Sequence, residues 1–106
     1  MSNQIIVHKA RTNTLVVRLG YDVSGDTFES EIRVEPNISS ELIVAWTIAW
    51  VTDGTDGDLL LTLDDSVTAP IDVSGGYMDL KRTTGGEPIA VFDRPLEVLF
   101  QGSVTA

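Results

Sequence analysis

The chain has 106 residues, of which 42% are hydrophobic, 16 are acidic and 7 are basic, and it contains no cysteine. This size fits a single domain over residues 1–106, and the missing cysteine excludes disulfides and thiolate metal sites. The net charge of −9 disfavours nucleic acid as a partner, because phosphate binding needs clustered lysine and arginine. We interpret the charge mainly as a means of keeping the chain soluble.

The start of the chain predicts neither export nor membrane insertion. Met1 to Gln4 carry no basic cluster, and the apolar run at residues 5–7 is too short for the centre of a signal peptide. A membrane-spanning helix needs about 20 apolar residues, and the longest apolar run here, residues 42–51, is interrupted by Thr47. We therefore expect the protein to be made and folded in a cytoplasm, without a membrane partner.

Short runs rich in β-branched and aromatic residues alternate with Gly, Asp, Asn and Pro clusters, a pattern typical of an antiparallel sandwich or barrel. The first three predicted strands cover residues 4–8, 14–19 and 27–34. The third alternates cleanly between apolar and charged side chains, which indicates a half-buried antiparallel strand. Its expected inner face consists of Phe28, Ser30, Ile32 and Val34.

The fourth predicted strand, residues 42–52, is apolar on both faces, and we therefore expect it at the centre of a sheet. Its β-branched residues and the Asp-Gly pair that follows favour a strand over the competing helix. Trp46, Ile48 and Trp50 share one face. Exposed tryptophans could stack on sugars, but their place in the most apolar run favours burial in the core.

Aspartates are concentrated on both sides of the fifth predicted strand, residues 59–63. Ca²⁺ takes several carboxylate oxygens, which makes the cluster a candidate calcium site, although its spacing differs from that of an EF-hand loop. Two Asp-Gly pairs between apolar runs also indicate a hairpin whose residues supply turn geometry, and we prefer this interpretation. The candidate ligands are Asp53, Asp56 and Asp58, with Asp64 and Asp65 beyond the strand.

A short helical turn is expected over residues 64–71, capped by Ser66 or Asp65. The sixth and seventh predicted strands, residues 77–82 and 88–92, each follow a pair of turn glycines. Neither pair opens a helix after a strand, so neither is a phosphate-binding loop. The proline that begins the seventh strand indicates the edge of a sheet.

The eighth predicted strand, residues 96–105, contains a segment with two interpretations. From Leu96 to Gly102 it matches the recognition sequence of the rhinoviral processing protease, which is used to remove purification tags, although Ser103 stands where the engineered site has proline. The segment alternates as a strand does, and without it the sandwich lacks a closing strand. We favour a native strand over an expression scar.

The inner faces of these eight strands predict the hydrophobic core. The expected core residues are Ile6, Leu15, Val17, Phe28, Ile32, Trp46, Ile48, Leu61, Leu63, Tyr77, Leu80, Val98 and Phe100.

Side chains suited to catalysis are few. His8 is the single histidine, whereas histidine metal sites use more than one and a Ser-His-Asp triad places its histidine between two partners. The glutamates at positions 29, 31, 35, 87 and 97 occur as exposed strand residues commonly do, so they do not indicate a carboxylate pair for hydrolysis. We expect no enzymatic activity, no catalytic residue and no cofactor.

Three segments resemble small structural proteins of phage virions. Residues 21–33, a turn followed by an outward-charged strand, are similar to the N-terminal domains of phage baseplate upper proteins. Residues 77–81 resemble a later strand of these proteins, and residues 96–105 resemble their last strand, which ends in Val-Thr. The glycine expected before that strand is replaced by Asp93-Arg94-Pro95.

The resemblance implies an immunoglobulin-like β-sandwich of about eight strands that serves as a structural component of a baseplate, tail or neck. It implies assembly as a homo-oligomer or with other virion proteins, a location in the virion after assembly in the host cytoplasm, and no catalytic residues. Two alternatives stay open: a carbohydrate- or ligand-binding β-sandwich module, which calcium could assist, and a capsid decoration protein.

Overall fold

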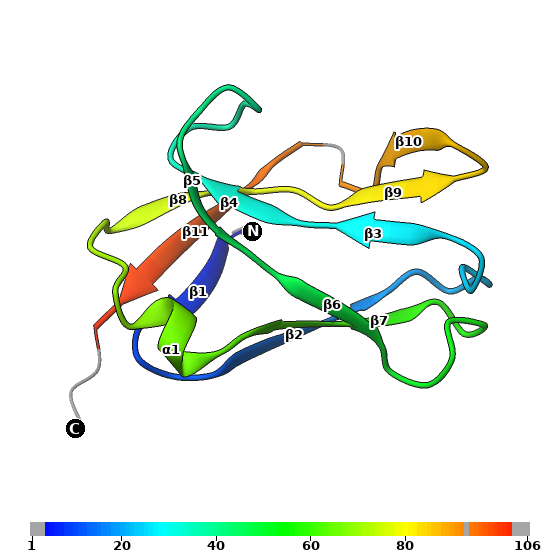
Figure 1. The fold of residues 1–106 in the computed structure, drawn as a ribbon, viewed down its shortest axis with the longest axis horizontal. Coiled ribbons are helices and arrows are strands. Elements are labelled where there is room, and N and C mark those ends of the chain that lie inside the picture. Colours follow the sequence, from blue (N-terminus) through cyan, green and yellow to red (C-terminus); the bar gives the residue numbers. More distant parts are fainter. Residues whose placement is uncertain (1–3, 93, 103–106) are drawn as a thin grey trace.

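In the computed structural model, which describes residues 4–92 and 94–102, eleven strands and one short helix make up the fold (Figure 1). The strands form two layers that face each other, so the predicted all-β sandwich is confirmed. The elements are β1 (Gln4–His8), β2 (Asn13–Arg18), β3 (Thr27–Glu29), β4 (Glu31–Arg33), β5 (Leu42–Ala45), β6 (Thr47–Trp50), β7 (Asp58–Leu63), α1 (Asp65–Thr68), β8 (Gly75–Met78), β9 (Lys81–Thr84), β10 (Glu87–Ala90) and β11 (Leu96–Gln101).

One layer is a sheet with the strand order β2-β7-β6. The other contains a five-stranded sheet, β1-β11-β8-β4-β5, and a three-stranded sheet, β10-β9-β3, which continue one another (Figure 1). The register confirms this continuity, because Glu29 lies opposite Lys81 in one sheet and Arg33 lies opposite Tyr77 in the next. β10 lies at the edge, as its proline predicts.

Three of the eight predicted strands are divided in two, and the divisions lie side by side. They separate β3 from β4, β5 from β6, and β8 from β9. The backbone N–H of Trp46 donates to the Ser30 carbonyl over 2.9 Å, and the Ser30 hydroxyl donates to the Asp79 carbonyl over 2.5 Å. The buried Ser30 side chain thus replaces a regular ladder bond and connects the strands at the interruption.

The strand predicted at the centre of a sheet lies at the edge of both layers, so that prediction was wrong. As far as Trp46 the chain pairs with β4, and from Thr47 onward it pairs with β7 in the other layer. A strand that changes layers forms a corner of a sandwich. Apolar side chains in this run, among them Leu42, Ala45 and Ala49, are exposed, which explains why the pattern suggested burial on both faces.

The core lies between the two layers and is centred on β7. Leu59, Leu61 and Leu63 are at most 1% exposed and alternate with half-buried outward residues. From the facing layer, Ile32 and Val98 are fully buried. The period of two in the sequence therefore predicts correctly which face of most strands is inside.

Two predicted core residues point outward instead. Ile6 is 46% exposed, and its neighbour Val7 is the buried residue of β1. Tyr77 is half-buried on the outer face of β8, where Met78 takes the inward position. Both errors are displacements of one residue, and in a strand such a displacement moves a side chain to the opposite face.

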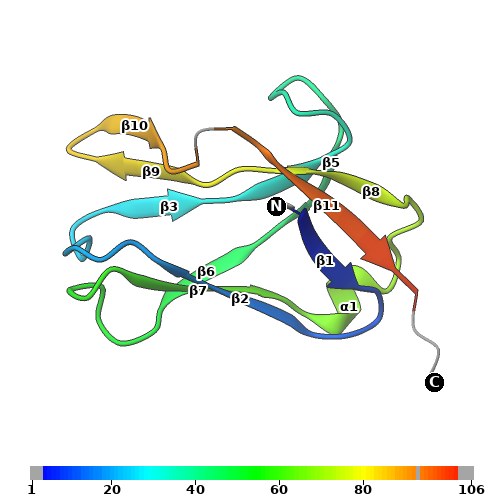
Figure 2. The ribbon, with the colours of Figure 1, turned by 180° about the vertical axis from the view of Figure 1, so that it is seen from behind.

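The last strand lies inside the five-stranded sheet, as Figure 2 shows from behind. β11 pairs antiparallel with β8 and parallel with β1; this parallel pair departs from the otherwise antiparallel pairing of the described strands. Phe100 is 6% exposed. The predicted strand is confirmed over Leu96–Gln101, and its continuation through residues 103–105 lies outside the described residues.

The predicted helical turn is confirmed as α1, but its predicted cap is wrong. The N-cap position belongs to Asp64, whose side chain makes no capping hydrogen bond. Asp65 instead accepts a bond from the backbone N–H of Ser66 within the first turn. The buried Thr68 hydroxyl donates to the Arg11 carbonyl over 2.9 Å, so the helix is held to the β1–β2 connection by a tertiary contact.

Candidate functional site

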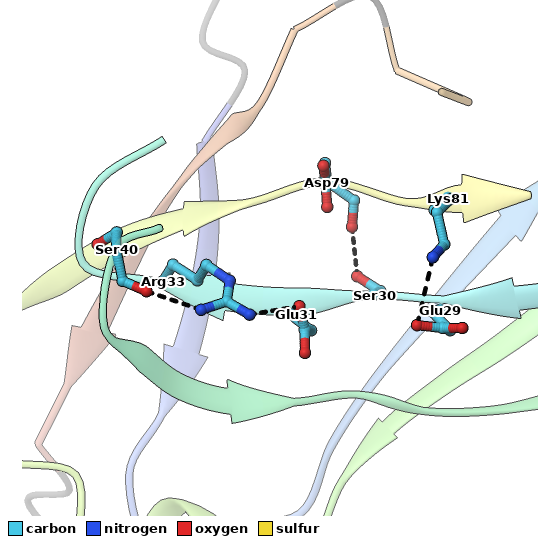
Figure 3. A network of polar contacts seen from close by, with 7 residues as sticks. All are labelled: Glu29, Ser30, Glu31, Arg33, Ser40, Asp79 and Lys81. Carbon is cyan, nitrogen blue, oxygen red and sulfur yellow. Dashed lines mark hydrogen bonds and ion pairs between the residues drawn. The ribbon is translucent and has the colours of Figure 1, made fainter. Parts of the chain in front are cut away.

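β3 pairs with β9, and β4 pairs with β8. The outer face of these four strands carries charged side chains (Figure 3). Lys81 Nζ lies 3.6 Å from Glu29 Oε2, and Arg33 Nη2 lies 2.9 Å from Glu31 Oε1. The constant register of the two strands places Asp79 opposite Glu31. The side chains that alternate with the core residues here are those of Glu29, Glu31, Arg33, Tyr77, Asp79 and Lys81.

The β4–β5 hairpin, residues 34–41, is fixed against this face. Arg33 Nη1 donates to the Ser40 carbonyl over 2.7 Å while Nη2 bonds Glu31 (Figure 3). The Ser40 hydroxyl accepts from the backbone N–H of Glu35 over 2.8 Å, and Val34 N–H donates to the Glu41 carbonyl. One arginine thus connects the strand, the neighbouring carboxylate and the loop.

A groove of about 140 Å³ lies between this hairpin and β8. Tyr77 lines it from β8, Asp79 lines it from the break between β8 and β9, Ile38 lines it from the hairpin, and Pro95 lines it at the entrance to β11. Ile38 is 87% exposed, the highest value among the exposed large hydrophobic residues of the described chain. Glu35 also lines the groove, and among the described residues neither Glu35 nor Asp79 takes part in an ion pair.

Sequence reasoning missed this groove. Its walls belong to a turn and to two strands that only the tertiary fold brings together. A local signal was present in Ile38, because an apolar residue between Pro-Asn and Ser-Ser in a turn has no core to enter.

Two of the candidate calcium ligands, Asp53 and Asp56, accept hydrogen bonds from their own loop. Asp53 accepts from the hydroxyl and the backbone N–H of Thr55 at 2.6 and 3.0 Å, and these bonds lower the pKa of Asp53 below its usual 3.8. Asp56 accepts from the backbone N–H of Asp58. Asp64 lies at the other end of the six-residue strand β7, about 20 Å away, so the fold divides the five aspartates into two groups.

Two glycines hold this loop against the neighbouring one. Gly54 and Gly57 have φ values of 87° and 79°, which residues other than glycine rarely adopt. Their carbonyls accept hydrogen bonds from the backbone of Val23 and Leu19, each over 2.9 Å. The Asp-Gly pairs therefore supply turn geometry, as the preferred interpretation of the sequence stated.

Arg82, next to Lys81 on β9, forms an enclosed ion pair. Its Nε lies 2.6 Å from Asp26 Oδ2, and the two side chains are 19% and 8% exposed. The guanidinium also lies 5.0 Å from the centre of the Tyr21 ring. Hydrogen bonds from the Thr84 hydroxyl and from Arg82 lower the pKa of Asp26 below 3.8, and Asp26 raises the pKa of Arg82.

The two tryptophans differ in exposure. Trp46 is 6% exposed, as predicted, and its Nε1 is a buried donor without a hydrogen-bond partner among the described residues. Trp50 is half-buried and packs edge-on against Phe28, with ring centres 5.9 Å apart. The rings of Trp50 and Phe28 line a depression between β3 and β6, each of which is an edge strand of its sheet.

The remaining candidates for chemistry are dispersed. His8 is exposed at the end of β1, where its backbone exchanges hydrogen bonds with the Asn13 side chain. Glu97 accepts from the Gln4 amide, and Glu87 lies exposed on β10. Within residues 4–92 and 94–102, no three His, Cys, Asp or Glu side chains are grouped to hold a metal ion, and no helix is long and apolar enough to cross a membrane.

The outer face of the β2-β7-β6 sheet carries almost no charge. Its residues align across the strands in three rows: Thr14, Thr62 and Thr47; Val16, Leu60 and Ala49; and Arg18 opposite Asp58. Val16 is 46% exposed. One acid and one base lie on this face, in a chain whose net charge is −9.

Comparison with models of known protein families gave no match, and no curated protein sequence matched the chain. Any functional proposal therefore depends on the fold and on the surfaces described above.

Proposed function

We propose that the chain is a structural protein of a phage virion, part of a baseplate, tail or neck, and that it works through protein–protein assembly. The three segments that resemble phage proteins, residues 21–33, 77–81 and 96–105, supply neighbouring strands of one layer. Their described parts include β3 and β4, which pair with β9 and β8, and β11, which pairs with β8. The resemblance thus concerns one connected part of the fold.

The outer face of the β2-β7-β6 sheet, which carries one acid and one base and therefore no net charge, is the observation that best supports assembly. In a chain of net charge −9, most surfaces repel a second copy. This face lacks that repulsion, and its exposed threonine and small apolar side chains suit packing against another sheet at about 10 Å. The proposed contact joins it to a second copy or to a neighbouring virion protein.

Size-exclusion chromatography with light scattering over a concentration series tests the assembly. We expect the mass to rise with concentration, and Val16→Lys to abolish that rise by placing a charge in the middle row. Val67→Lys is the matched control, because Val67 is 40% exposed on α1, away from the face. A strict monomer at high concentration that also fails to bind neighbouring virion proteins would count against the proposal. The phage origin is tested separately by asking whether portal, tail or capsid genes adjoin this gene.

A carbohydrate- or ligand-binding module is the second candidate, and the position of Trp50 favours it. Trp50 and Phe28 present aromatic surface to the depression between β3 and β6, and sugars stack on such surfaces. Glycan binding that quenches tryptophan fluorescence, and that is lost in Trp50→Ala, would favour this candidate over assembly. A capsid decoration protein would use the same contacts as the first proposal at another place in the virion.

A further inference from the structure

The groove between the β4–β5 hairpin and β8 lies on the opposite side of the sandwich from the uncharged face. We propose that it binds an extended, lysine- or arginine-containing segment of a partner protein. The inference rests on the proposed role in protein–protein contacts, but it does not depend on self-association.

The charge of the groove selects a basic partner. Lys81 and Arg33 are already paired with Glu29 and Glu31. The remaining two carboxylates of the lining, on Glu35 and Asp79, have no ion-pair partner among the described residues. A cation entering the groove therefore meets two uncompensated negative charges, in a protein whose overall charge of −9 already attracts basic partners.

The shape of the groove suits a long basic side chain. Ile38 and Pro95 contribute apolar surface to the lining, on which the methylene stem of lysine or arginine can pack while its charged end reaches the carboxylates. Tyr77 belongs to the same lining, and an aromatic ring adds a surface that attracts cations. Arg33 holds the hairpin in place through the Ser40 carbonyl, so the wall exists before the partner binds and little ordering is needed.

A second copy of the chain is a poor occupant for this groove. Two such faces brought together would place Glu35 and Asp79 of one copy near acidic residues of the other, and like charges across an interface oppose association. The occupant is therefore expected to be a different polypeptide.

Peptide titration followed by NMR tests the inference. The probe is a short capped peptide in which lysine alternates with threonine, and the matched peptide has glutamate in place of lysine. We expect the lysine peptide to shift the amide signals of Glu35, Asn37, Ile38 and residues 77–79, and the glutamate peptide to shift none. In Glu35→Gln/Asp79→Asn, binding should weaken about tenfold or more, and about 1 M salt should abolish it because the screening length falls to about 3 Å.

The matched control is Glu87→Gln/Asp72→Asn, which removes the same charges from exposed positions elsewhere. It should bind within about twofold of the wild type, which is under about 0.5 kcal/mol. Equal weakening by both double variants would show attraction to net charge alone and overturn the inference, as would shifts outside the groove or no binding at millimolar peptide. Self-association that persists in these cases would leave the proposed function intact. Circular dichroism verifies that each variant is folded.

Discussion

The outer faces of the two layers are built on the same strand geometry but differ in charge and shape. On the face where β3 and β4 pair with β9 and β8, the outward residues include two ion pairs, Arg33–Glu31 and Lys81–Glu29, and the hairpin fixed by Arg33 makes the surface concave. On the β2-β7-β6 sheet, the outward residues form rows of threonine and small apolar side chains. Alternation decides which residues face water, but the choice among outward residues distinguishes the charged, concave surface from the nearly uncharged one.

Both faces depend on one core, and removing its central side chain should have the largest effect. Leu61→Ala is expected to lower the free energy of unfolding by about 2–5 kcal/mol through lost burial and the cavity left behind, because Leu61 is fully buried. Urea denaturation followed by tryptophan fluorescence measures this. Leu60→Ala, one residue away on the outward face, should cost about 1 kcal/mol or less. Equal losses would contradict the assignment of the two faces of β7.

Arg82 on β9 forms an ion pair with Asp26, and the dependence of stability on pH should show its contribution. The pKa of Asp26 is lowered by Thr84 and Arg82, so its charged form contributes stability above the unfolded value near 3.8, and this contribution is lost as pH falls through the lower folded value. Asp26→Asn should lower the urea midpoint at pH 7 and reduce the dependence of stability on pH below about 4. Glu87→Gln is the exposed control, and a wild-type pH profile for Asp26→Asn would contradict the role of the pair.

The charged layer is continuous because Ser30 bridges its interruption. Ser30→Ala removes the hydroxyl that donates a hydrogen bond to the Asp79 carbonyl. The free energy of unfolding should fall by about 1–3 kcal/mol, because a partly buried acceptor is left unsatisfied. Ser39→Ala is the control, since Ser39 is an exposed hairpin residue that bonds only the nearby Asn37 side chain in the described contacts. Hydrogen exchange should show faster opening of β3 and β9 in the first variant alone. Unchanged exchange there would mean that the sheet continues without the bridge.

The outer ion pair should contribute least. Lys81 and Glu29 are 46% and 69% exposed and 3.6 Å apart, and such pairs contribute about 0.2–1 kcal/mol. Glu29→Gln should therefore shift the urea midpoint only slightly, and about 1 M salt should remove the difference. A large loss would mean that the charged face stabilises the fold, and this would weaken the interpretation of that face as a recognition surface.

Local periodicity predicts much of this fold and little of its surfaces. The eight predicted runs correspond to the observed strands, and the predicted inner face of the third is correct for Phe28, Ser30 and Ile32, because both follow from the spacing of apolar residues. Val34 lies beyond the end of β4 and outside the core. The change of layer at Trp46 was not predictable, since it depends on which distant strand each half meets. The groove was missed for the same reason. Asp79 is far in sequence from Glu35 and Ile38, which share one hairpin, and only pairing between β4 and β8 brings Asp79 to them.

The parallel pairing of β1 with β11 determines how the protein responds to force. Gln4 begins β1 beside Glu97, and His8 ends it beside Gln101, so tension applied through the two ends of the chain pulls these strands in opposite directions along their length. Their hydrogen bonds are then loaded together in shear, whereas an antiparallel pair held at one end opens bond by bond. A chain built this way resists stretching through its two ends more strongly than one closed by an antiparallel pair that opens from one side.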